Sequence, residues 1–202
     1  MSTLLEERQD ILHTIYNRRA VRAYTVQRPS DGVIRELLDA AVQAPTAMHV
    51  EPWAFVIVQD KALLKRLSDR AKAMLLDEIK TGGELARDAA MAARLQAMLG
   101  DPSFNIFYDA GTLIAICRKP LGPYAEADCW LAAENLMLAA CAKDLGTCCI
   151  GFAIPILNAS DVKHELGIPD DVAAVVPIIV GFPRGSIETV SRKAPQVLRW
   201  VK

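Results

Sequence analysis

Arginines near the amino end of the chain have the spacing that points most clearly to chemistry. They stand in the run RRAVRAY at residues 18–24, where Arg18 and Arg22 are four positions apart. If this run is extended, the two side chains lie on one face, because alternate residues of an extended chain do so. Val21 and Tyr24 are apolar neighbours, which makes a wholly solvated position less usual. From these residues alone, anion binding and solvated surface charge are about equally supported.

A proline-bounded loop, within APTAMHVEPWAFVIV at residues 44–58, is a second candidate. Pro45 ends the preceding helix, because proline cannot continue a helix and restricts the residue before it. Pro52 precedes the run 53–58, whose aromatic and β-branched residues predict a buried strand. A rigid loop between a helix and a core strand is a common place for a ligand. Taken alone, the two prolines are better explained as loop punctuation.

Motifs of several other site classes do not occur in the sequence. Without G-x-G-x-x-G or G-x-x-x-x-G-K-[ST], a Rossmann or phosphate-loop site is unsupported. The three histidines are far apart and neither C-x-x-C nor H-E-x-x-H is present, so we expect no metal site. Cys148 and Cys149 stand in the small segment TCCIG at residues 147–151. We interpret them as core thiols, because reactive cysteines need an electropositive, accessible setting.

The composition of the chain argues against nucleic-acid and membrane partners. The chain has 202 residues, 52% of them hydrophobic, with 23 basic against 24 acidic side chains. This balance gives no nucleic-acid footprint. No apolar run approaches the roughly 20 residues of a membrane helix, and the polar start MSTLLEERQD is unlike a signal peptide. We therefore expect no membrane partner and a cytoplasmic protein with reduced cysteines.

The expected elements alternate between helices and strands within one domain, residues 1–202. Helices are expected at about 5–17, 31–44, 61–75, 84–99, 125–145 and 161–166, and core strands at 53–58, 112–117 and 173–180. This order indicates an α+β or α/β class. Glycine-rich breaks make 80–108 a helical excursion. The helix at 125–145 is apolar all round at 136–142, which predicts burial on every side, with Gly146 as its C-cap.

Four segments together resemble the FMN-dependent nitroreductase family. RRAVRAY followed by APTAMHVEPWAFVIV is similar to the family pattern RRSVRxF…APSxxNxQPWxF, and this pair at this spacing is specific. LGTCCIGF resembles the family's glycine-rich segment before its last strand, and GFPRGSIETVSRKAP resembles its closing motif. The resemblance covers about residues 11–195. It implies an α+β fold with a mixed central sheet surrounded by helices, and a buried core helix at an obligate homodimer interface.

The resemblance also implies FMN as cofactor, with NADH or NADPH as electron donor and a nitroaromatic, quinone or related small molecule as acceptor. No catalytic side chain is expected, because the flavin carries the chemistry. The implied FMN-binding residues are Arg18, Arg19, Ala20, Arg22, Pro45, Thr46, Ala47, His49, Cys149, Ile150, Gly151, Arg192 and Lys193. The aromatic residues Phe104, Phe107 and Tyr108 are expected to contact substrate.

The implied roles differ between segments. Arg18 and the pair 192–193 would bind the FMN phosphate, since side-chain cations must do so where no glycine-rich helix start exists. Arg22 would lie at the N1 and O2 edge of the flavin, where reduction places negative charge. Residues 44–47 and His49 would come from the partner subunit, and 149–151 would pass the N5 edge.

Three positions depart from the family pattern. Ala20 stands where serine is usual, His49 where asparagine is usual and Glu51 where glutamine is usual. The last change brings a negative charge toward a flavin that becomes anionic. These departures, with the aromatic cluster at 104–108, keep two alternatives open. One is a member with another reductive reaction, such as enoate reduction, dehalogenation or flavin breakdown. The other is a non-catalytic FMN-binding dimer.

Overall fold

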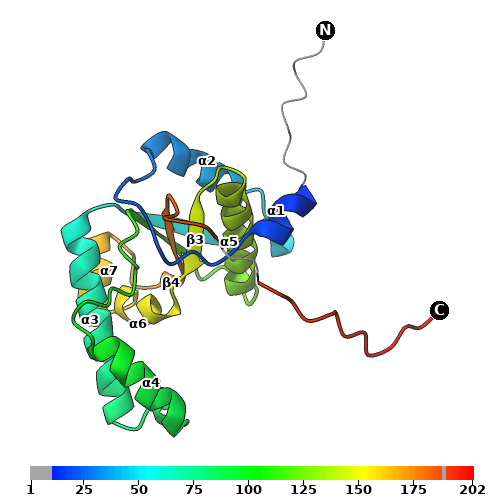
Figure 1. The fold of residues 1–202 in the computed structure, drawn as a ribbon. Coiled ribbons are helices and arrows are strands. Elements are labelled where there is room, and N and C mark those ends of the chain that lie inside the picture. Colours follow the sequence, from blue (N-terminus) through cyan, green and yellow to red (C-terminus); the bar gives the residue numbers. More distant parts are fainter. Residues whose placement is uncertain (1–10, 188–189) are drawn as a thin grey trace.

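A computed structural model describes residues 11–187 and 190–202 and has a four-stranded sheet with helices on both faces (Figure 1). The strands are β1 (Trp53–Val58), β2 (Thr112–Arg118), β3 (Gly146–Cys149) and β4 (Ala173–Gly181), in the spatial order β1-β2-β4-β3. The core strands predicted at 53–58, 112–117 and 173–180 are β1, β2 and β4. β3 lies in the small segment before residue 150, for which no strand is predicted.

The sheet is antiparallel, so the expected mixed sheet is wrong for these four strands. Every hydrogen-bonded pair of strands runs antiparallel. The reason lies in the connections. Between β1 and β2 the chain passes through two helices, which returns it in the opposite direction. A single helix then links β2 to β3, so these two strands point the same way, but β4 inserts between them and runs against both. The one parallel contact among the described residues is an isolated bridge between Ala20 and Thr147.

Seven helices are described together with three short 3-10 turns. They are α1 (Ile11–Asn17), α2 (Asp31–Ala41), α3 (Lys61–Lys80), α4 (Ala89–Gly100), α5 (Ala125–Cys141), α6 (Ile154–Leu157) and α7 (Ser160–Leu166), with turns at Ala47–His49, Glu84–Ala86 and Gly151–Ala153. Ser30 Oγ accepts a hydrogen bond from Val33 N at 3.4 Å, and an Asp60 oxygen accepts one from Leu63 N at 2.7 Å. These caps start α2 and α3 where the sequence predicts helices. The predicted residues 5–10 of the first helix lie outside the described part.

The two faces of the sheet build two hydrophobic cores. Leu113 and Ala115 of β2 pack on one side with α3 and α6, while Ile114 and Ile116 pack on the other with α2 and α5. This alternation follows from the period of two in a strand. Because both faces are covered, β2 is buried along almost its whole length. The core thus fixes α3 and α5 on opposite sides of the sheet.

Helix α5 differs from the expectation in two ways. It ends at Cys141, and Gly146 is not its C-cap but the first residue of β3. A Cβ at Gly146 would lie 2.7 Å from Val21 Cβ, so this glycine permits close packing of two chain segments. Within a single chain, burial on every side is also wrong, because Trp130 is 44% exposed and Leu131 is exposed as well.

The segment between β1 and β2 forms a projecting helical pair. α3 extends past the sheet, and α4 folds back along its far end (Figure 1). The predicted excursion at 80–108 corresponds to the end of α3, to α4 and to the loop before β2. In the described part of the chain, no helix combines the length and the apolar character needed to cross a bilayer.

Candidate functional site

The arginine run lies directly beside β3. Val21 N donates a hydrogen bond to Thr147 O at 2.9 Å, next to the bridge between Ala20 and Thr147. The absence of a side chain at Gly146 allows this approach. Two of the four motif segments, RRAVRAY and TCCIG, are therefore joined by backbone hydrogen bonds although they are far apart in sequence.

The start of the closing motif joins the same arrangement. Thr25 N donates to Phe182 O, and Arg184 N donates to Ala23 O, both at 2.9 Å. Tyr24 is buried at this junction, and its hydroxyl donates to Val21 O at 2.7 Å. Burial raises the pKa of Tyr24 well above its usual value, so its hydroxyl remains a hydrogen-bond donor. A third segment is thus fixed against the arginine run.

The three arginines of the run have different environments. Arg18 Nε lies 3.3 Å from Glu134 Oε1 on α5, so this side chain is already engaged in an ion pair. Arg19 turns back on the chain, where its Nη1 donates to Tyr16 O at 2.6 Å and to Arg18 O at 2.8 Å. Arg22 is exposed and forms no ion pair with any described residue. Of the three, Arg22 is the one whose guanidinium is held neither by a carboxylate nor by a backbone carbonyl in the described part of the chain, so its charge is available to an anion.

The small segment at residues 147–151, which begins within β3, combines a buried start with an open end. Cys148 packs in the core that includes α3, whereas Cys149 packs against the core of the opposite face. Burial raises the pKa of both thiols, to about 11 for Cys149, and the Arg22 guanidinium opposes part of the rise at Cys148. The two thiols lie on opposite faces of the sheet and are protonated near neutral pH. Both observations agree with the interpretation of these cysteines as packing residues. Ile150 is buried, while a Cβ at Gly151 would meet nothing within 4 Å, so the backbone there is open to a flat ligand.

The proline-bounded loop has an unusual backbone. Met48, His49 and Glu51 have φ values of 55°, 54° and 45°, a left-handed region that costs non-glycine residues roughly 1 kcal/mol or more each. The loop is held by a side chain that the sequence interpretation missed. Asp128 of α5 is only 4% exposed, and its carboxylate oxygens accept hydrogen bonds from Ala47 N at 3.3 and 3.2 Å. A carboxylate at the start of an otherwise largely apolar helix was the signal in the sequence.

Helix α5 contacts both the proline-bounded loop and the arginine run, but it does not bring them together within one chain. The loop residues concerned are Pro45, Thr46 and Ala47. Asp128 and Glu134 are six residues apart, which corresponds to about 9 Å along the helix and about 240° around it. The helix therefore presents the loop contact and the Arg18 contact on different faces. The expectation that residues 45–49 reach the flavin of a partner subunit stays a prediction.

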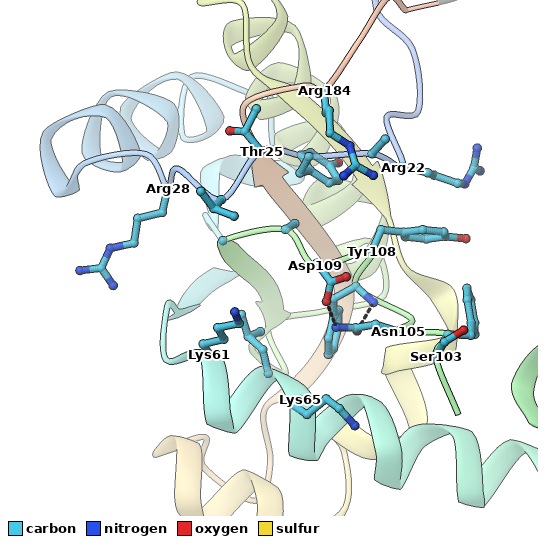
Figure 2. Close-up of a pocket in the computed structure, with 18 of the residues that line it drawn as sticks. Arg22, Thr25, Arg28, Lys61, Lys65, Ser103, Asn105, Tyr108, Asp109 and Arg184 are labelled. Atoms are coloured by element: carbon cyan, nitrogen blue, oxygen red, sulfur yellow. Dashed lines mark hydrogen bonds between the residues drawn. The ribbon is translucent and has the colours of Figure 1, made fainter. Parts of the chain in front are cut away.

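The predicted substrate residues border one cavity of about 920 Å³ (Figure 2). Phe104 and Tyr108 form an edge-to-face pair with ring centroids 5.7 Å apart. Phe107 is buried and forms part of the wall. Arg22 and Tyr108 extend toward the same side of the cavity (Figure 2). The structure thus brings the aromatic cluster and one of the predicted flavin contacts together.

The basic pair near the carboxyl end is not part of this assembly. Arg192 and Lys193 are exposed and lie in a tail that leaves the body of the molecule (Figure 1). Neither side chain lines the cavity of Figure 2. Their role at the FMN phosphate stays a prediction.

Comparisons with known proteins agree with the motifs. The profile of the Nitroreductase family matches residues 15–182. A curated protein from Archaeoglobus fulgidus, provisionally named NADH dehydrogenase/NAD(P)H nitroreductase, is 27% identical over 176 residues, covering 87% of each chain. An iodotyrosine deiodinase from Thermotoga neapolitana is 24% identical over 82% of this chain and 84% of its own.

Solved structures resemble the fold along nearly its whole length. A nitroreductase with bound FMN from Bacteroides fragilis has a TM-score of 0.78 at 24% identity, covering 96% of this chain and 99% of its own. An FMN-bound nitroreductase from Desulfitobacterium hafniense has a TM-score of 0.74 at 23% identity, covering 91% and 94%. At these identities the likeness establishes the fold alone.

Proposed function

Because this chain belongs to the Nitroreductase family, we propose that it is an FMN-dependent NAD(P)H oxidoreductase acting on nitroaromatics, quinones or a related small acceptor. Donor and acceptor would use the site in turn, as in a ping-pong reaction. When bound, FMN supplies the redox chemistry, taking hydride from NADH or NADPH and passing it on. The protein's own task is to bind, orient and shield these molecules.

The observation that carries the proposal is the position of Arg22. Its guanidinium has no carboxylate partner in the described chain and belongs to a segment hydrogen-bonded to β3, which leads into the open backbone at Gly151. A free cation beside small, apolar residues suits a flat ligand that gains negative charge. Arg22 would hold that charge, and residues 149–151 would line the ring.

Arg18 fits the phosphate of FMN on one condition. Its pairing with Glu134 would have to be shared with, or given up to, the incoming phosphate. Such an exchange is inexpensive, because partly exposed ion pairs contribute only about 1 kcal/mol or less. Arg19 fits less well, since its guanidinium already donates to two backbone carbonyls.

We also propose that the enzyme is a homodimer. α1 and α5 pack together and expose a group of large apolar side chains, namely Ile11, Ile15, Tyr16, Trp130 and Leu131. A second copy of the chain would cover these side chains, since large exposed apolar surface often marks interaction sites. The same association would supply residues 45–49 of the partner to the flavin. All five cysteines are free, which suits the reducing cytoplasm.

An anaerobic titration tests the proposal. The purified protein should be yellow, and NADH or NADPH should bleach its flavin absorbance, which an acceptor should then restore. A colourless protein that cannot be reconstituted with FMN contradicts the proposal. Flavin that binds but is reduced by neither nicotinamide would indicate a non-catalytic FMN-binding dimer.

Reductive dehalogenation is the second candidate. It is favoured by the similarity to an iodotyrosine deiodinase and by the aromatic pair of Phe104 and Tyr108 beside Arg22. A panel of nitroaromatics, quinones, enoates and halogenated phenols would separate the two reactions. If halogenated phenols are turned over faster than every nitroaromatic, the second candidate replaces the first.

A further inference from the structure

The walls of the cavity in Figure 2 carry more positive than negative charge. Its cations are Arg22, Arg28, Lys61, Lys65 and Arg184, which come from three separate parts of the chain. Lys65 is paired with Asp69, at 2.6 Å between Nζ and Oδ2. The other four cations form no ion pair with residues 11–187 or 190–202.

The two acids at the cavity are engaged by neutral groups. Asp109 Oδ1 accepts a hydrogen bond from Asn105 Nδ2 at 2.8 Å. Asp101 Oδ1 accepts from Ser103 N at 2.8 Å and from Ser103 Oγ at 2.7 Å, and these bonds hold the pKa of Asp101 below its usual value. Neither carboxylate is paired with one of the four cations, so the positive charge remains available to a ligand.

Two of these cations are set in place by local structure. A Cβ at Gly111 would lie 2.7 Å from Arg28 Cβ, so the chain at Arg28 packs closely against the start of β2. Lys61 is the first residue of the 20-residue helix α3, where the helix dipole favours an anion and opposes a cation. A lysine at this position lowers the stability of the helix, and its charge adds to the positive field of the helix N-terminus.

We propose that Arg28, Lys61 and Arg184 bind the phosphate groups of the nicotinamide dinucleotide donor. This inference rests on the proposed function, because it requires that such a donor is used. Arg22 and Tyr108 extend toward one side of the cavity and Arg28 toward the other (Figure 2). The nicotinamide would bind at the Arg22 side, where the flavin is expected, and the phosphates would reach the remaining cations.

Charge favours the donor over the acceptor as occupant. Nitroaromatics and quinones are neutral, so three unpaired cations would give them little. The pyrophosphate of the donor carries about two negative charges, and the 2′-phosphate of NADPH adds nearly two more. Guanidinium and ammonium groups are the usual ligands of such phosphates. The volume of about 920 Å³ lies within the range of pockets for ligands of this kind.

The first test measures binding without turnover. Inorganic pyrophosphate and NADP⁺ are titrated into the FMN-loaded protein by calorimetry at low salt. We expect Lys61→Gln and Arg184→Gln each to raise the dissociation constants about three- to tenfold, and the double variant to raise them further. Lys80→Gln is the matched control, because Lys80 lies on the same helix about 28 Å from Lys61 and should change nothing.

The second test compares hydride donors in anaerobic stopped-flow experiments. The same variants should slow flavin reduction by low concentrations of NADH and NADPH. They should leave reduction by 1-benzyl-1,4-dihydronicotinamide unchanged, because this donor has no phosphate. Equal effects on all three donors, or no effect on any, would overturn the inference.

Failure of the inference can be told apart from failure of the proposed function. If the benzyl donor and the nicotinamides bleach the flavin and the variants behave like Lys80→Gln, the proposed function stands and the phosphate site is wrong. If pyrophosphate binds only to FMN-free protein, the cations hold the flavin phosphate and the inference is overturned. If no donor reduces the flavin, the proposed function fails and the inference fails with it.

Discussion

At the scale of single residues, one arginine run has three distinct roles. Arg22 has no carboxylate partner among the described residues, Arg18 is paired with Glu134, and Arg19 donates to the carbonyl groups of two preceding residues. The spacing RRAVRAY predicts only that Arg18 and Arg22 point the same way. It cannot predict which guanidinium is engaged, because Glu134 is more than a hundred residues away and meets Arg18 only through the packing of α5.

Glu134→Gln tests whether Arg18 belongs to the FMN site. Removing the carboxylate charge leaves the guanidinium of Arg18 free for the phosphate, so the dissociation constant of FMN should fall about two- to fivefold. Quenching of flavin fluorescence measures this constant. Glu126→Gln removes an exposed charge from the same helix and is the control. Weaker FMN binding in Glu134→Gln would mean that the glutamate orients Arg18 rather than competing for it.

Buried thiols should make the free energy of unfolding fall as the pH rises in the alkaline range. Burial raises the pKa to about 11 for Cys117 and Cys149 and to about 12 for Cys129. In the unfolded chain thiols ionise near pH 8.5. Their stabilising contribution is therefore complete below about pH 8.5, and it is lost as pH rises through the folded pKa values, because the unfolded state releases its protons first.

Urea unfolding between pH 8 and pH 10.5 measures this effect. The free energy of unfolding should decline steadily above about pH 9. Cys149→Ala should show a shallower decline than the unchanged protein, since one of the thiols has been removed. Parallel curves for the two proteins would show that other groups cause the pH dependence.

At the scale of elements, the sequence predicts the helices and strands of long, strongly patterned segments correctly, but it does not predict the structure of every short segment. β1, β2 and β4 fall where apolar runs predict strands, and caps at Ser30 and Asp60 start their helices as expected. β3 was missed because four small residues have no periodicity of their own; they become a strand by pairing with β4. The sequence predicts Gly146 as a helix cap, whereas the structure needs glycine there for close contact with Val21, a tertiary requirement that the local sequence does not contain.

The contact between Asp128 and Ala47 predicts how the proline-bounded loop is held. Asp128→Asn keeps the shape of the side chain but removes the charge that strengthens its hydrogen bonds to Ala47 N. The free energy of unfolding should fall by about 1 to 2 kcal/mol. Hydrogen exchange at the Ala47 amide should become faster, and FMN binding should weaken if the loop contacts the flavin.

A surface carboxylate separates this positioning effect from a general loss of charge. Asp39→Asn on the exposed face of α2 removes the same charge and should change neither hydrogen exchange at Ala47 nor FMN binding. If Asp128→Asn lowers stability while exchange at Ala47 stays unchanged, the carboxylate supports α5 rather than the loop.

At the scale of the whole molecule, one chain assembles only part of the predicted site. The segments at 18–24, 147–151 and 181–184 meet through backbone hydrogen bonds. Residues 45–49 lie toward another face of α5, and the pair 192–193 lies in the outer tail. Motif spacing along a sequence carries no information on which copy of a chain supplies a segment. The family resemblance therefore predicts which residues belong to the site, but it does not predict that one chain brings all of them together.

Trp130→Glu tests whether a second copy completes the site. Trp130 is 44% exposed on α5, the helix on which α1 packs, and a buried charge at a subunit interface is strongly unfavourable. We expect the variant to change from dimer to monomer in analytical ultracentrifugation. Because residues 45–49 would then be missing from each flavin site, it should also lose most of its FMN during gel filtration.

Met91→Glu provides the matched control for this last variant. Met91 is 50% exposed on α4, which packs on α3 and not on α5, so the same charge is added to an equally exposed apolar position outside the α1–α5 surface. It should remain dimeric and yellow. If Trp130→Glu is monomeric yet keeps its FMN, one chain suffices for the flavin and residues 45–49 have no part in binding it. If both variants remain dimeric, the subunits associate through a surface other than α1 and α5.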